Sequence, residues 1–153
     1  MKSNSLPLLF LFAALLLSTF STAQTVPVRP YHDGPVWDIT FVKVKPGVGL
    51  KYMYYLAEDW KKEQEALKKA SLTLDYKVIE TEAHGSGDWN LMLMTEYKDL
   101  ATMEANADKE EAVAMQALSS DDKKMIEGYQ NRSEWREISA NRRGREIVLE
   151  PKK

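Results

Sequence analysis

Hydrophobic and polar residues alternate in two stretches on either side of a loop that contains glycine. Residues 72–79 and 89–97 show the period of two that is typical of pleated strands. The loop between them, His84 to Asp88, contains two glycines, which favour a tight reversal of the chain. The pattern therefore predicts a β-hairpin. Both of its faces carry apolar residues, so we expect both faces of the sheet to be covered.

Three further patterns extend the hairpin to a complete fold. Trp37 to Val44 is rich in β-branched and aromatic residues, which predicts a first strand. Val48 to Ala70 has apolar residues at spacings of three and four, which predicts an amphipathic helix. Helical segments follow between Leu100 and Trp135, and Arg145 to Leu149 predicts the last strand. We therefore predict an α+β, ferredoxin-like βαββαβ fold with a four-stranded antiparallel sheet and extra helical segments before the last strand.

The amino-terminal segment has the features of a secretory signal peptide. Lys2 supplies a positive charge, Leu8 to Leu17 is apolar, and Ser21 to Ala23 are small, which predicts a signal peptide over residues 1–23. The alternative is a membrane anchor, but this apolar run is shorter than the ~20 residues that span a bilayer. Prolines and a glycine predict a flexible leader over residues 24–34. We expect the folded domain over residues 35–150.

Composition narrows the setting and the partners. A length of 153 residues with 44% hydrophobic and 29% charged residues is typical of one globular domain. The net charge of -2 argues against nucleic acid as a partner. The chain contains no cysteine, so no disulfide is possible. We expect an exported protein of the bacterial periplasm or exterior that has no membrane contact after cleavage of the signal peptide.

Four segments carry a resemblance to known proteins: Val36 to Gly47, Gly87 to Leu91, Thr95 to Lys98 and Arg145 to Ile147. They resemble the dimeric α/β-barrel superfamily, and most closely its small exported bacterial proteins of unassigned function. The resemblance covers residues 35–150. It implies a homodimer in which two four-stranded sheets face each other and enclose a barrel, with the helices outside.

Residue parity assigns the strand side chains to the two faces of this sheet. We expect the helices to contact Trp37, Ile39, Phe41, Leu72, Leu74, Tyr76, Val78, Trp89, Leu91, Leu93, Ile147 and Leu149. We expect the barrel interior to contain Asp38, Thr40, Val42, Asp75, Lys77, Ile79, Asn90, Met92, Met94, Glu96, Glu146 and Val148. The assignment assumes that no β-bulge exchanges the faces.

The barrel interior is the candidate site for a small, largely apolar molecule, because its lining mixes apolar and polar groups. The candidate lining residues are Asp38, Thr40, Asp75, Lys77, Asn90, Met92, Met94, Glu96 and Glu146. The four carboxylates among them either converge on a cation or pair with Lys77 and with arginines across the dimer. We favour pairing and expect no metal. His84, at the barrel mouth, is either a general base or an exposed turn residue.

The resemblance also implies several possible activities. The superfamily includes cofactor-independent monooxygenases, haem-degrading monooxygenases, haem peroxidases and lactone isomerases. His32 in the leader and His84 in the turn do not match an axial haem ligand on a helix, so we expect no cofactor. We predict a small-molecule-binding protein of unassigned role. One alternative is a cofactor-independent monooxygenase or isomerase that acts on an aromatic or enolisable substrate, and another is a structural dimer without a cavity.

Overall fold

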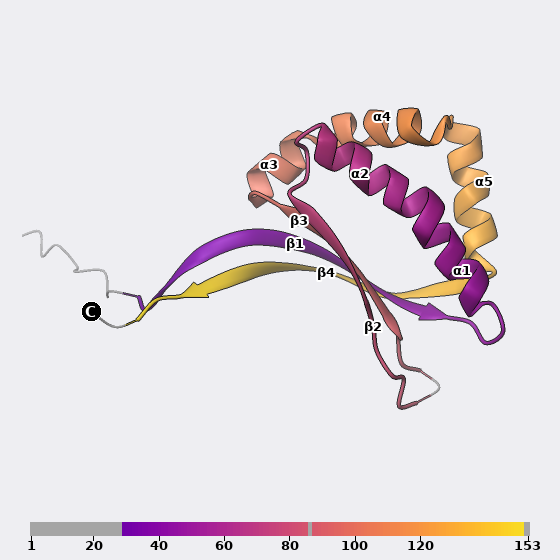
Figure 1. Cartoon of the computed structure of the whole chain (residues 1–153), viewed down its shortest axis with the longest axis horizontal. Coiled ribbons are helices and arrows are strands. Elements are labelled where there is room, and N and C mark those ends of the chain that lie inside the picture. The colour runs from indigo at the N-terminus through magenta and orange to yellow at the C-terminus, as the bar shows by residue number, and fades with distance from the viewer. Residues whose placement is uncertain (1–28, 86, 152–153) are drawn as a thin grey trace, which may run out of the picture.

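A four-stranded antiparallel sheet with helices on one face forms the body of the molecule. The computed structural model describes residues 29–85 and 87–151. The strands are β1 (Tyr31–Val44), β2 (Asp75–Glu80), β3 (Leu91–Tyr97) and β4 (Arg136–Leu149), in the spatial order β2-β3-β1-β4 (Figure 1). The predicted α+β class and ferredoxin-like strand order are confirmed.

The helices lie on the same side of the sheet (Figure 1). The first helical segment consists of α1 (Gly49–Tyr55), a π-helical turn η1 (Leu56–Trp60) and α2 (Lys61–Lys69). The predicted helix matches this segment, but its periodicity gave no sign of the π-helical turn. The helices α3 (Leu100–Ala105), α4 (Ala107–Leu118) and α5 (Asp122–Ser133) follow β3. Asp99 caps α3 by accepting a hydrogen bond of 2.7 Å from the backbone N–H of Thr102.

Strands β1 and β4 are much longer than predicted. β1 begins at Tyr31, so residues 31–34 belong to the sheet and not to a flexible leader. β4 begins at Arg136, nine residues before the predicted start of the last strand at Arg145. Figure 1 shows the start of β1 and the end of β4 extending beyond the helices. We call this extension the β1–β4 arm. The predicted signal peptide, residues 1–23, lies outside the described residues.

The hydrophobic core lies between the centre of the sheet and the first helical segment. It contains Val42, Tyr52, Leu56, Leu91 and Leu93, and the first two have no exposed surface. Burial of each large apolar side chain contributes roughly 1.5–3 kcal/mol to stability. This core therefore packs α1 and the start of η1 against β1 and β3.

The register shows that the predicted faces of β1 are wrong. Directly opposed residues of paired strands lie on the same face of a sheet. The pairs Asp38–Thr95, Thr40–Leu93 and Val42–Leu91 therefore lie on the helix face, because Leu91 and Leu93 belong to the core. The open face carries the pairs Trp37–Glu96, Ile39–Met94 and Phe41–Met92. Asp38, Thr40 and Val42 thus do not face a barrel interior.

The error in β1 has a physical cause. We placed its aromatic and aliphatic residues against the helices because apolar side chains are usually buried. In the structure Trp37, Ile39 and Phe41 lie on the open face, and Trp89 contacts Phe41 edge to face at 4.7 Å between ring centroids. The register shifts of the sheet occur in the pairing of β1 with β4. They therefore do not explain why the β1 side chains lie on the face opposite to the predicted one.

The edges of the sheet differ from prediction as well. Ile147 and Leu149 lie in the β1–β4 arm and are 48% and 79% exposed, so they do not pack against helices. Val78 lies on the helix face as predicted, because it pairs with Leu93, although it is 39% exposed; Leu74, just before β2, is 47% exposed. Within residues 29–85 and 87–151, no helix is long and apolar enough to cross a membrane.

Candidate functional site

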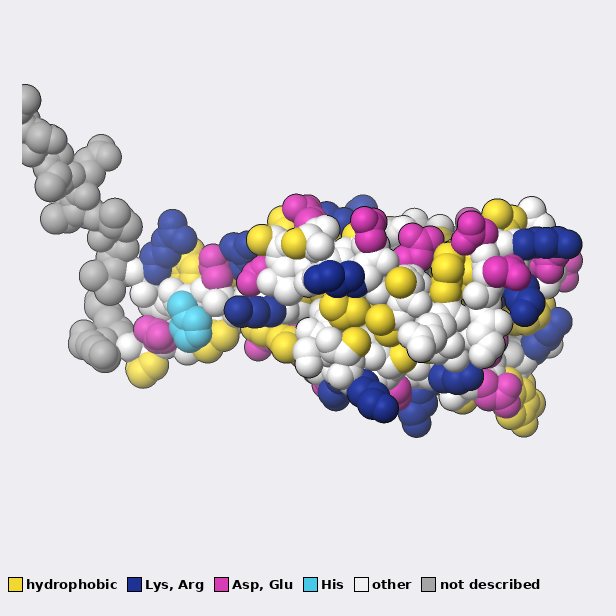
Figure 2. All heavy atoms as spheres, turned by 90° about the horizontal axis from the view of Figure 1, so that it is seen from above, with side chains coloured by type: hydrophobic (Ala, Val, Ile, Leu, Met, Phe, Trp, Pro, Cys, Tyr) yellow, Lys and Arg dark blue, Asp and Glu magenta, His cyan; other side chains and the backbone are white. Residues whose placement is uncertain are grey.

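A cavity of about 770 Å³ lies between the helix face of the sheet and the helices α1, α2, α4 and α5. Its floor is formed by β1 and β3, including Asp38, Thr40, Thr95 and Tyr97. Figure 2 shows the helix-covered side of the molecule, where acidic and basic side chains surround small groups of hydrophobic ones. The volume falls within the range of small-molecule pockets in proteins.

The π-helical turn η1 helps to form one wall of this cavity. A π-helical turn holds more residues than an α-helical turn, and such turns are frequent at functional sites. Tyr52 and Tyr55 line the cavity before η1, Trp60 lines it at the end of η1, and Glu63 and Gln64 line it after η1. The first helical segment therefore presents aromatic rings, a carboxyl group and an amide to the same space.

Carboxyl groups gather at one end of the cavity. The hydroxyl of Tyr97 donates a hydrogen bond of 3.0 Å to Oε2 of Glu110. Oε1 of Glu110 is buried and has no hydrogen-bond partner among the described residues. Burial raises the pKa of Glu110, and the nearby charge of Asp38 raises it further. Burial also raises the pKa of Asp38, against the opposing effect of Arg143. We call Asp38, Tyr97 and Glu110 the acidic end.

Two arginines lie at the other end. The guanidinium of Arg132 is 4.5 Å from the ring centre of Tyr129, and that of Arg136 is 5.8 Å from the ring centre of Tyr52. In the described part of the chain, the Nε atoms of both arginines and the hydroxyl of Tyr52 are buried without a hydrogen-bond partner. Burial raises the pKa of Tyr52 to about 12, although Arg136 opposes the shift. We call Tyr52, Arg132 and Arg136 the basic end.

Glu63 and Gln64 lie between the two ends. Burial raises the pKa of the Glu63 carboxyl, and the positive charge of Arg132 opposes this shift. The hydroxyl of Thr95 donates a hydrogen bond of 3.1 Å to Oε1 of Gln64, which fixes the orientation of that amide. The cavity can therefore hold a molecule with polar groups at both ends, and its carboxyl groups can exchange protons closer to neutral pH than ordinary ones.

The structure distributes the predicted site residues over several places. Asp38 and Thr40 line the cavity on the helix face. Asn90 is structural, because its Oδ1 accepts a hydrogen bond of 2.9 Å from the backbone N–H of Val44. His84 is exposed in the loop between β2 and β3, where its backbone N–H donates to Asp88. Lys77 lies on the open face, with its Nζ 4.6 Å from the ring centre of Trp37.

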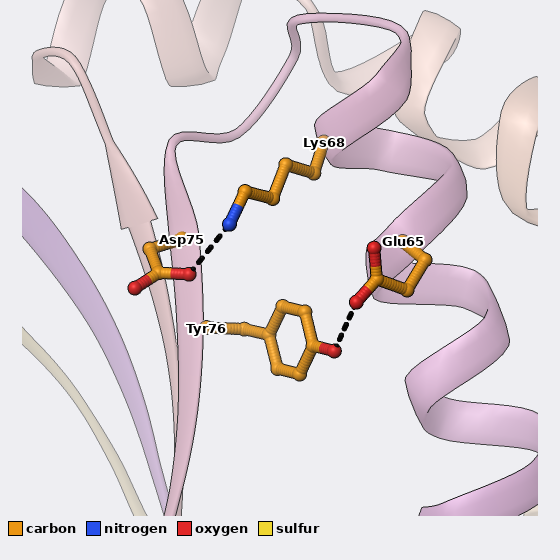
Figure 3. Close-up of polar contacts among 4 residues, drawn as sticks. All are labelled: Glu65, Lys68, Asp75 and Tyr76. Carbon is orange, nitrogen blue, oxygen red and sulfur yellow. Dashed lines mark hydrogen bonds and ion pairs between the residues drawn. The ribbon is translucent and has the colours of Figure 1, made fainter.

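Of the four predicted carboxylates, Asp38 lies on the helix face, whereas Asp75, Glu96 and Glu146 lie on the open face, as parity predicted. Asp75 forms an ion pair of 2.9 Å with Lys68, and the neighbouring Tyr76 donates a hydrogen bond to Glu65, so both contacts hold α2 on β2 (Figure 3). Glu146 accepts a hydrogen bond of 3.5 Å from the indole of Trp37.

Met92, Met94 and Glu96 remain on the open face, as predicted from parity. Burial raises the pKa of Glu96, and the charges of Asp75 and Glu146 add to the rise. The described residues contain no group of three or more His, Asp or Glu side chains placed to hold a metal ion. That the open-face residues line a barrel stays a prediction.

Sequence reasoning missed most of the residues that line the cavity. The tyrosines at positions 52 and 55 flank the apolar stripe of the predicted helix, a pattern that also suits packing at a helix margin. Tyr97, Glu110 and Arg136 come from β3, α4 and β4, and no short motif connects them. Only the three-dimensional fold brings these residues together.

Comparisons with known proteins support the fold and leave the activity open. No protein family model matches the chain, and no curated protein matches its sequence. A NipSnap family protein of unknown function from Agrobacterium tumefaciens is 10% identical and has a TM-score of 0.51, over 80% of this chain and 96% of that chain. This likeness shows a shared fold.

Two other solved structures are similar at lower TM-scores. HapK from Hahella chejuensis is 9% identical with a TM-score of 0.46, over 71% of this chain and 90% of that chain. A dimeric protein of unknown function with a ferredoxin-like fold from Bacteroides fragilis is 21% identical with a TM-score of 0.39, over 76% and 96%.

Proposed function

We propose that this protein is an exported homodimer that binds a small molecule between the sheet and the helices of each protomer. The observation that carries the proposal is the cavity of about 770 Å³ with buried polar atoms that have no partner among the described residues. A buried polar group without a hydrogen bond costs free energy, and a ligand that supplies the bond removes that cost. The proposed site thus lies within the protomer and not in the space between two sheets.

The open face of the sheet supports the dimer. Trp37, Ile39, Phe41, Met92 and Met94 all lie there, and each is only partly buried. Contiguous apolar surface of this kind is typical of protein–protein interfaces. A second copy of the chain would cover it with an identical sheet, as the resemblance to dimeric α/β barrels implies. Export rests on the sequence of residues 1–23, which has the features of a signal peptide.

An acid–base enzyme is the second candidate, and the carboxyl groups of the cavity favour it. The pKa values of Asp38, Glu63 and Glu110 are all raised, chiefly by burial. Carboxyl groups with raised pKa values can act as general acids or bases near neutral pH. Such chemistry would suit an aromatic or enolisable substrate in a reaction without a bound cofactor.

Native mass spectrometry of residues 24–153, purified from the exported fraction, tests the main proposal. We expect a dimer that carries additional mass, and we expect that mass to be absent after denaturation. A dimer without additional mass, in protein purified without any step that strips ligands, would contradict binding. A monomer would contradict the assignment of the open face as the dimer interface.

A further inference from the structure

The two ends of the cavity offer opposite kinds of hydrogen-bonding group. At the basic end, Tyr52 and the Nε atoms of Arg132 and Arg136 are donors without an acceptor among the described residues. Both guanidinium groups lie beside aromatic rings, and Arg132 is also close enough to the Glu63 carboxyl for their charges to interact. At the acidic end, Oε1 of Glu110 is an acceptor without a donor. A molecule that satisfies both ends must itself have two different polar ends.

The ends are well separated along the sheet. Arg136 is paired with Val44 on β1, whereas Asp38, at the acidic end, lies six positions earlier on the same strand. Six residues of strand span roughly 20 Å, from which the reach of the side chains is subtracted. The ligand must therefore be elongated.

Between the two ends, apolar and aromatic walls lie beside the polar side chains of Glu63 and Gln64. Trp60 and Tyr55 line the cavity from the first helical segment, Leu93 from the sheet, and Ala114 and Met115 from α4. Flat rings pack favourably against such walls. Gly128 leaves room for the guanidinium of Arg132 at the basic end, because a Cβ atom at position 128 would lie 2.9 Å from Nη1 of that arginine.

We propose that the cavity binds an elongated aromatic molecule that carries an oxyanion, such as a carboxylate, at the basic end and a hydroxyl or amine donor at the acidic end. This inference rests on the proposed binding function and specifies its ligand class. Arginine is well suited to the oxyanion, since its guanidinium offers several donors in one plane. A wholly apolar ligand would displace water from the cavity and leave the donors of Tyr52, Arg132 and Arg136 without an acceptor. Buried donors without an acceptor cost free energy.

Isothermal titration of the full mature chain with matched probes tests this ligand class. The probes are 4'-hydroxybiphenyl-4-carboxylic acid, its methyl ester, its 4'-methoxy analogue and unsubstituted biphenyl. We expect the hydroxy acid to bind best, and the ester and the methoxy acid each to bind about tenfold or more weakly, because each lacks one polar end. Equal binding by the hydroxy acid and biphenyl would overturn the proposal.

Variants locate the oxyanion. Arg136→Met should weaken binding of the hydroxy acid by about tenfold or more and leave binding of the methyl ester unchanged. Lys123→Met is the matched control, because the Lys123 side chain on α5 is 85% exposed and does not line the cavity. An equal loss for acid and ester in Arg136→Met would overturn the assignment of the oxyanion to the basic end.

The outcomes separate this inference from the proposed function. If native mass spectrometry finds a retained molecule and the hydroxy acid binds no better than the ester, the binding function stands and the ligand class is refuted. If no molecule is retained and none of the four probes binds, both are refuted.

Discussion

Replacement of Tyr52 by Phe tests whether the Tyr52 hydroxyl lacks a hydrogen-bond partner in the ligand-free protein. Tyr52 has no exposed surface, and its hydroxyl has no hydrogen-bond partner among the described residues. A buried hydroxyl without a partner costs about 1–3 kcal/mol in mutational studies. Tyr52→Phe removes this group and keeps the ring in the core. We therefore expect the free energy of unfolding of the ligand-free protein to rise by about 1–3 kcal/mol.

Urea denaturation followed by tryptophan fluorescence measures this change. With a urea slope of about 1–3 kcal/mol per molar, the midpoint should rise by roughly 1 M. All variants are compared at one protein concentration, since dimerisation contributes to stability. Tyr54→Phe is the control, because Tyr54 is 59% exposed and its replacement should leave the midpoint unchanged. A lower or unchanged midpoint in Tyr52→Phe would show that the hydroxyl already has a partner and would refute the reasoning.

Three other variants test the dimer, the carboxyl groups and the strand pairing. Met92→Arg places a charge on the open face and should convert the dimer to a monomer in sedimentation, whereas Lys62→Arg on the exposed helix surface should not; an intact Met92→Arg dimer would refute the interface. Burial raises the pKa of Glu63 in the folded protein above its usual 4.5. The contribution of Glu63 to the free energy of unfolding is therefore complete below pH 4.5 and is lost as the pH rises through the raised pKa. Glu63→Gln should therefore flatten the fall in the free energy of unfolding between pH 4.5 and 7, and an identical pH profile would contradict this. Asn90→Ala leaves the backbone N–H of Val44 without its acceptor and should cost about 1–2 kcal/mol in urea denaturation; no loss would contradict a structural role for Asn90.

The order of strands and helices could be predicted because the local patterns are strong. The hairpin has a clear period of two, and the segment from Val48 to Ala70 has a clear helical period. The cap of α3 is equally local, because Asp99 accepts its hydrogen bond from a backbone N–H only three residues further along the chain. These features depend on residues close together in the chain.

The face of β1 could not be predicted because its alternation has two physical solutions. Trp37, Ile39 and Phe41 would be buried equally well by helices or by a second sheet. The choice depends on the register with β3, which sets Val42 against the core and Asp38 in the cavity. The basic end could not be predicted from the sequence either. Arg136 belongs to the long strand β4, whose charged residues do not follow the alternating pattern of a strand.

The most direct test of the account is native mass spectrometry on a variant in which the cavity is filled. Ala114 is buried on α4 and lines the cavity, so Ala114→Phe should occupy part of its volume. Ala112→Phe places the same ring on the exposed side of the same helix. We predict that the wild-type protein and Ala112→Phe retain a small molecule as dimers and that Ala114→Phe is a dimer without it. Retention of the molecule by a folded Ala114→Phe dimer would contradict a binding site between the sheet and the helices.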